Sequence, residues 1–187
     1  MIEEVTLHPI AILEAQAIAR IQEKGREVAV VAPCIPFQLM RRPTERVEIV
    51  PDKEQAVVLP GGWTGMDPVT GTAVSFDPLV TRAPKAAPAI GIHPPWRRSP
   101  GRARLTWRIS LPSATPVTFS TAVAIRDTLA PEPPSDGVTF RVLVDGQTLF
   151  ATHSSSMEWE EARVDLSPFA GKEIGLALES DVGPNVW

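Results

Sequence analysis

The residues around position 96 are the best suited in this chain to bind a ligand. Trp96 follows Pro94 and Pro95 and precedes Arg97 and Arg98. A flat indole face on a surface loop can stack on the apolar face of a sugar ring, while neighbouring planar polar groups hydrogen-bond the hydroxyls. The pattern favours Trp96 and Arg97 as ligand-binding residues. The alternative is that the indole packs within the fold.

Three further residues are candidates for the same chemistry. Arg126 and Arg141 could clamp a pair of hydroxyls or an acidic sugar, although strand arginines are commonly solvated. Trp159 opens an expected strand after the polar run at residues 153–156, so it could serve either a site or the core.

The proline-rich loop of residues 130–135 offers a candidate metal site. Asp127 and Asp136 flank it and could share a calcium ion, although aspartates at such positions also form turns by bonding their own backbone. His93 is expected to be a buried structural histidine, because it has no partner at a ligand spacing. Cys34, the single cysteine, excludes an intramolecular disulfide and is expected to be a buried thiol.

Catalytic motifs are missing from the sequence, so we expect no enzyme. There is no Gly-x-Ser-x-Gly elbow, HExxH motif or phosphate-binding glycine loop. The acids Glu158, Glu160 and Glu161 resemble a solvated stretch. A net charge of −4 gives no general attraction to nucleic acid. A polyanion-binding patch remains an alternative for five arginines, Arg97, Arg98, Arg102, Arg104 and Arg108.

Period-two alternation predicts an all-β protein. Leu105, Trp107 and Ile109 alternate with polar residues, and Trp107 is therefore expected in the core. Residues 138–144 form another alternating run, followed by Asp145-Gly146, a strong signal for a type I′ hairpin turn. Further strands are expected at residues 28–32, 47–50, 56–59, 71–78, 117–125, 159–166 and 173–178. Many short strands separated by turn signals are typical of a β-sandwich or jelly roll.

One helix is expected, over residues 9–24. Ile10, Leu13, Ala17 and Ile21 recur at helical spacing, and Gly25 suits the position after the last turn. No apolar run approaches the roughly 20 residues of a membrane span. The first residues lack the basic region of a signal peptide, so we expect either an internal protein or a piece of a longer exported chain.

The order of several motifs over residues 70–187 resembles the NPCBM type (novel putative carbohydrate-binding module) of galactose-binding-like jelly roll. These motifs are Gly91–Trp96, Val117–Asp127, Ser135–Gly146, Val164–Gly171 and Leu176–Pro184. The resemblance implies a non-catalytic accessory module, often attached to secreted or surface bacterial proteins. It also implies glycan binding in some members and a structural calcium in some relatives.

The expected organisation is an N-terminal extension over residues 1–65 and a sandwich over residues 66–187. Domains of this type continue into a last strand with a tryptophan, whereas this sequence ends at Trp187. We expect a fragment, or an N-terminal extension that covers the open sheet edge. The leading functional hypothesis is a carbohydrate-binding or accessory module of a bacterial surface or secreted protein. The alternative is an assembly domain that contacts other proteins without binding sugar.

Overall fold

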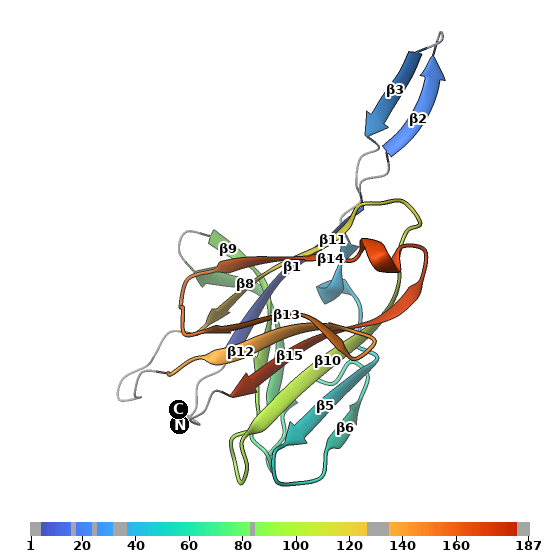
Figure 1. Ribbon diagram of the computed structural model, residues 1–187. Coiled ribbons are helices and arrows are strands. Elements are labelled where there is room, and N and C mark those ends of the chain that lie inside the picture. Colours follow the sequence, from blue (N-terminus) through green and yellow to red (C-terminus); the bar gives the residue numbers. More distant parts are fainter. Residues whose placement is uncertain are drawn as a thin grey trace.

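Alternating apolar and polar residues form strands throughout the described chain. The computed structural model describes residues 5–15, 18–23, 26–31, 37–82, 85–126 and 135–182. The strands lie in two large sheets and one small sheet, and every pair among these residues is antiparallel. The prediction of an all-β protein is confirmed, and the architecture is that of a β-sandwich (Figure 1).

The first large sheet has seven strands. Along the sheet they are β14 (Glu160–Asp165), β11 (Val117–Ile125), β1 (Val5–Ala15), β9 (Lys85–His93), β8 (Ala73–Arg82) and β7 (Gly65–Met66), with β4 (Phe37–Gln38) also paired to β1.

The second large sheet has six strands. Their order is β13 (Gln147–Ser154), β12 (Val138–Val144), β15 (Glu173–Val182), β10 (Gly101–Ser110), β5 (Arg46–Pro51) and β6 (Val57–Pro60).

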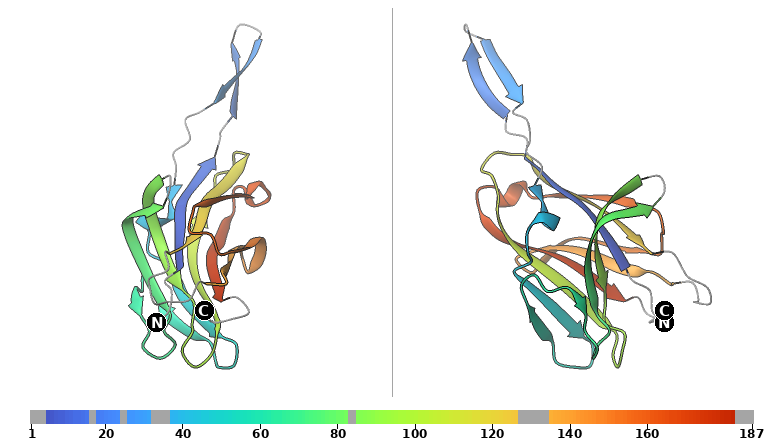
Figure 2. Two further views of the ribbon diagram at one scale, coloured as in Figure 1. Left: turned by 90° about the vertical axis from the view of Figure 1, so that its left-hand side faces the viewer. Right: turned by 180° about the vertical axis from the view of Figure 1, so that it is seen from behind.

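A third pair, β2 (Ile18–Glu23) and β3 (Arg26–Val31), forms a hairpin that stands away from the two large sheets (Figures 1 and 2). Two short 3-10 helices, η1 (Leu39–Arg41) and η2 (Ser167–Phe169), complete the described elements. No helix in the described ranges is long and apolar enough to cross a membrane.

The core lies between the two large sheets, which form the two layers seen in Figure 2. Its largest fully buried side chains are Trp107, Phe119 and Phe140, from β10, β11 and β12. The Ser180 hydroxyl of β15 donates to the Ile92 carbonyl of β9 at 3.2 Å, which ties one sheet to the other. The prediction of Trp107 as a core residue is confirmed, because only 1% of it is exposed.

The strand predictions with the clearest alternation are also confirmed. Residues 117–125 form β11 over the expected range, and the alternating run before Asp145 forms β12. Asp145 and Gly146 connect β12 to β13 with φ angles of 49° and 84°. A type I′ turn requires positive φ at both central residues, which explains this dipeptide between two strands.

The helix predicted over residues 9–24 is wrong for the part that the structure describes. Residues 5–15 form β1 and residues 18–23 form β2. β1 pairs with both β9 and β11, so backbone bonds to two neighbouring strands outweigh the local helical spacing. Its register with β11 shifts between His8 and Ile12, where Pro9 has no N–H to donate to the ladder.

Strands from residues 1–65 belong to both large sheets. β1 is inserted between β9 and β11, and β5 pairs with β10 over six residue pairs. Each sheet therefore contains strands from both sides of the boundary expected at residue 65. The buried thiol expected at Cys34 lies outside the described residues.

Candidate functional site

The predicted sugar platform at Trp96 is held in a network of contacts with a neighbouring turn. Trp96 is half-buried, and its indole Nε1 donates to the Gly71 carbonyl at 3.1 Å. The Arg97 guanidinium lies 4.8 Å from the centre of the indole ring, a cation–π distance. The backbone amides of Trp96 and Arg97 both donate to the Thr70 carbonyl. These contacts fix the turn of residues 67–72 and occupy part of the indole surface.

His93 is buried beside this network. Its Nδ1 lies 2.7 Å from the Pro94 carbonyl, and its ring centre is 6.5 Å from that of Trp96. Burial lowers the pKa of His93 to about 4; the bond to Pro94 opposes this effect and the nearby charge of Arg126 adds to it. His93 is therefore neutral at pH 7. Among the described residues its Nε2 has no hydrogen-bond partner.

The other residues predicted for this ligand site lie on different parts of the fold. Arg126 lies close enough to affect His93, whereas Arg141 belongs to the other sheet and faces away from the core. Trp159 is half-buried and directly precedes β14. The sequence-based assignment of these residues to one ligand site remains a prediction.

The calcium prediction rests on Asp127 and Asp136. Asp127 lies outside the described residues, and the Asp136 carbonyl is bonded by His153 Nε2 at 2.9 Å. Within the described ranges, no group of three His, Cys, Asp or Glu side chains could hold a metal ion. The calcium site therefore remains a prediction, and the mechanism proposed below takes no step through calcium.

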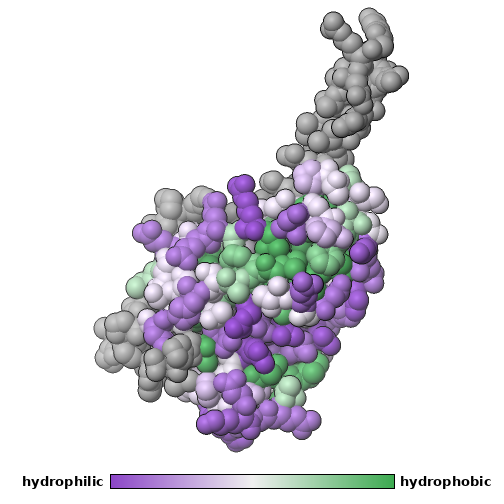
Figure 3. Space-filling view, in the orientation of Figure 1, coloured by the Kyte–Doolittle hydropathy of each residue, from purple (hydrophilic) through white to green (hydrophobic). Residues whose placement is uncertain are grey.

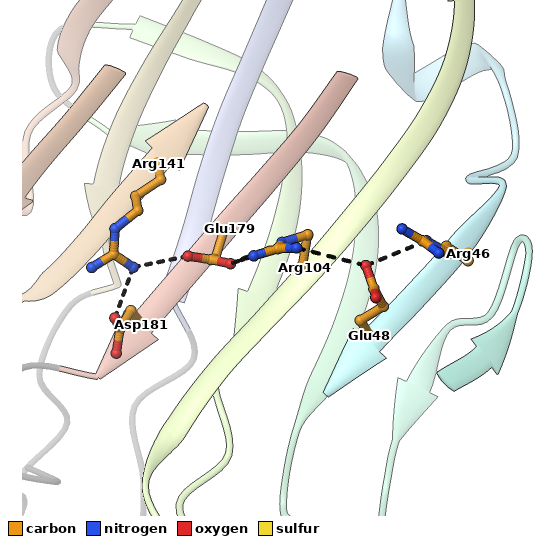
Figure 4. Close-up of polar contacts among 6 residues, drawn as sticks. All are labelled: Arg46, Glu48, Arg104, Arg141, Glu179 and Asp181. Atoms are coloured by element: carbon orange, nitrogen blue, oxygen red, sulfur yellow. Dashed lines mark hydrogen bonds and ion pairs between the residues drawn. The ribbon is translucent and has the colours of Figure 1, made fainter. Parts of the chain in front are cut away.

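A row of ion pairs crosses the outer face of the six-stranded sheet (Figure 4). Arg104 donates to Glu179 Oε2 through Nε at 2.9 Å and Nη2 at 2.6 Å. Arg141 Nη1 donates to Glu179 Oε1 at 2.9 Å and to Asp181 Oδ2 at 2.7 Å. The side chain of Glu179 is only 2% exposed, so this carboxylate is buried beneath two guanidinium groups.

The row continues onto β5. Glu48 Oε2 lies 3.3 Å from Arg46 Nε and 4.0 Å from Arg104 Nη1. Figure 3 shows hydrophilic residues over much of this view, around a group of hydrophobic residues. Strand register explains the row, because Arg141, Glu179, Arg104 and Glu48 stand directly opposite one another on four adjacent strands.

The pKa of Arg141 reflects this environment. Burial acts to lower it, but the hydrogen bonds to Asp181 and Glu179 outweigh burial and raise it. Arg141 therefore remains charged at any ordinary pH and is committed to two carboxylates of its own sheet.

Beside this row the surface is hollowed. The hollow has a volume of about 160 Å³. Buried or small residues, Leu143, Ala177, Gly175 and Thr106, form its floor, and more exposed polar residues form its rim. A cavity of about 150 Å³ holds a single benzene ring, so this space suits one six-membered ring. The rim residues are Glu45, Arg46, Arg104, Arg108, Asp145 and Gly146.

Two contacts fix the rim. The Gly175 amide donates to Asp145 Oδ1 at 2.8 Å, and the Asp145 amide donates to the Gly175 carbonyl at 2.9 Å. The β12–β13 turn is thereby bonded to β15. On the opposite side, Arg108 Nη2 lies 3.2 Å from Glu45 Oε1, and this bond raises the pKa of Arg108.

Thr106 is the unusual polar residue of the floor. It is 7% exposed, and its Oγ1 has no hydrogen-bond partner among the residues that the structure describes. Buried hydroxyl groups are normally satisfied, because an unpaired one costs about 1–3 kcal/mol. Thr106 therefore has a buried hydroxyl group that is energetically unfavourable, and it lies at the floor of the hollow.

Sequence reasoning missed this hollow. The alternation of Arg104, Thr106 and Arg108 with core residues of β10 was the available signal, since it places these three side chains on one outer face. The arginine cluster considered for polyanions is divided by the fold. Arg97 and Arg98 lie in the loop after β9, whereas Arg104 and Arg108 are ion-paired on β10.

Comparison of the chain with known protein families, with curated protein sequences and with solved structures gave no match.

Proposed function

We propose that this protein is a non-catalytic carbohydrate-binding or accessory module. The observation that carries the proposal is the hollow on the six-stranded sheet. Its rim offers guanidinium donors and carboxylate acceptors, and its floor includes the apolar side chains of Leu143 and Ala177. A sugar ring presents the complementary surfaces, hydroxyl groups at its edge and C–H groups on its faces.

The mechanism is reversible binding without bond chemistry. Hydroxyl groups bond to the rim while the ring lies over the floor, and water leaves the enclosed surface. The resemblance of residues 70–187 to NPCBM domains supports this assignment, and with it a jelly-roll topology of galactose-binding-like type. It also supports a setting in a bacterial surface or secreted protein, attached to a larger assembly.

A glycan panel tests the proposal. Purified protein should bind at least one family of neutral oligosaccharides, with a dissociation constant measured by calorimetry. Protein unfolded by heat is the control for non-specific adsorption. Absence of binding by the folded protein across a broad panel of plant, microbial and host glycans contradicts the carbohydrate assignment.

The exposed valines of β6 favour a second function, that of an assembly domain. Val57 and Val58 are 43% and 62% exposed on a strand that ends the six-stranded sheet. An apolar edge strand of this kind pairs readily with another chain. This alternative predicts that the mass measured by light scattering rises with protein concentration. Val58→Lys should abolish that rise. A monomer at all concentrations, unchanged by this variant, counts against self-assembly.

A further inference from the structure

We infer that the hollow binds one uncharged sugar ring and discriminates against carboxylated sugars. This inference rests on the proposed carbohydrate function and adds the class of ligand and its location. It is carried by the charge balance of the hollow, by the unpaired hydroxyl of Thr106 and by the space above Gly175.

The guanidinium groups of the rim are already neutralised by the protein. Arg104 pairs with Glu179, Arg46 with Glu48 and Arg108 with Glu45. Across the hollow and the adjoining row there are four arginines and five carboxylates, which leaves one negative charge in excess. The cations are Arg46, Arg104, Arg108 and Arg141, and the anions are Glu45, Glu48, Asp145, Glu179 and Asp181.

This balance disfavours an anionic ligand. A carboxylate in the hollow would face Glu45 and Asp145 on the rim and would have to displace an existing partner of an arginine. Hydroxyl groups face no such conflict, because each can donate to a carboxylate and accept from a guanidinium. The mixed rim therefore suits a neutral polyol.

Thr106 supplies a polar group that lacks a partner among the residues that the structure describes. Rotation about its Cα–Cβ bond to another staggered rotamer moves Oγ1 to the position of Cγ2, the methyl group that lies on the side of Gly175, and moves the methyl to the position of Hβ. The hydroxyl then faces the floor of the hollow, where a ligand hydroxyl can bond to it. Ligand binding would thus satisfy a polar group that has no partner within the described part of the chain.

Gly175 keeps the floor open. A Cβ built at this position would lie 3.4 Å from Asp145 Oδ1 and 3.7 Å from Thr106 Cγ2, which are ordinary contact distances. An alanine therefore fits without displacing its neighbours, while its methyl group occupies space that a ring would use. Gly175→Ala is accordingly a mild structural change and a direct obstruction of the site.

The test compares matched sugar pairs by calorimetry or NMR titration. Galactose with galacturonic acid and glucose with glucuronic acid each differ only at the sixth carbon, and oligomers of each extend the series. For the best-bound pair, we expect the uncharged member to bind at least about tenfold more tightly. Equal or tighter binding of the acid overturns the preference for an uncharged ring.

Two variants locate the site. Thr106→Val and Gly175→Ala should each weaken binding of the preferred sugar by about fivefold or more, the scale of one hydrogen bond or a partial steric block. Thr118→Val, on β11 of the other sheet, is the matched control and should bind normally. Thermal unfolding should show Thr106→Val to be at least as stable as the parent, because the lost hydroxyl bonds to none of the described residues.

The outcomes separate this inference from the proposed function. If no sugar binds the parent protein, the carbohydrate function fails and the inference fails with it. If sugars bind and both variants retain the parent affinity, the function stands and the hollow is not its site.

Discussion

Individual polar residues of this protein are buried in two contrasting ways. Glu179 is covered by Arg104 and Arg141, which satisfy both of its carboxylate oxygens. His93 and Thr106 are buried with a polar atom left unpaired within the described residues. The first arrangement stabilises the sheet, whereas the second destabilises it unless another molecule or another state supplies a partner.

Replacing Glu179 tests the ion-pair row. Glu179→Gln keeps the shape but removes the carboxylate charge and presents an amide N–H₂ to a guanidinium group, so the three bonds that Glu179 accepts from Arg104 and Arg141 are weakened or lost. We expect a loss of about 1–3 kcal/mol in the free energy of unfolding, measured by urea denaturation. Glu173→Gln, at an exposed position on the same strand, is the control and should change stability little. Equal stability of both variants contradicts the structural role of the row.

The lowered pKa of His93 predicts that the free energy of unfolding depends on pH. Its pKa is about 4 in the folded protein and about 6.5 when unfolded, so at intermediate pH the unfolded chain binds the proton more readily. Stability is therefore fully present above the unfolded pKa and is lost as pH falls through this window. From pH 8 to pH 5 we expect His93 to account for a loss of about 2 kcal/mol.

The variant His93→Gln separates this effect from other groups. It removes the titrating ring, so the slope of stability between pH 8 and pH 5 should flatten. Asp67 and Asp165 have lowered pKa values, and their contributions are lost only at more acidic pH. An unchanged slope in His93→Gln would assign the pH dependence to another residue.

At the scale of elements, a turn and a strand end hold each other in place. Trp96 bonds to Gly71, and Asp67 Oδ2 accepts bonds from the amide and the hydroxyl of Thr70. Gly71 has a φ of 77°, and a Cβ at this position would collide with the indole of Trp96. Both the positive φ and the close approach of the indole require glycine at this position.

Gly71→Ala should therefore displace the indole from the turn. We expect a loss of about 1–3 kcal/mol and a red shift of tryptophan emission, because Trp96 becomes more hydrated. Gly146→Ala is the matched control, since it also has positive φ but meets no atom within 4 Å. If Gly71→Ala behaves like this control in both measurements, the Trp96 contact does not hold the turn.

The secondary-structure elements show which features of the fold could be predicted from the sequence. The alternation in β10 and β11 and the Asp145-Gly146 turn follow from local rules, and the structure confirms them. The helix expected over residues 9–24 failed because long-range pairing of β1 decided its conformation. The hollow depends on the register of β5, β10, β12 and β15, which local periodicity does not specify.

At the scale of the whole molecule, two sheets enclose one core between them. The core draws large side chains from both sheets, so its position is explained by hydrophobic burial alone. The outer face of the six-stranded sheet instead carries paired charges around a small hollow. A sheet that presents such a hollow can bind a ligand with little change of its backbone, through rotation of side chains such as that of Thr106.

The most direct test of this account is an NMR titration of the isotope-labelled protein with the best-bound neutral sugar. We predict shifts of the backbone amide signals of Thr106, Gly146 and Gly175, while the indole N–H signal of Trp96 stays in place, because Trp96 lies in the loop after β9 and does not line the hollow. If the Trp96 indole signal moves and the three amide signals do not, the hollow is not the sugar site. Binding would then lie at the loop after β9.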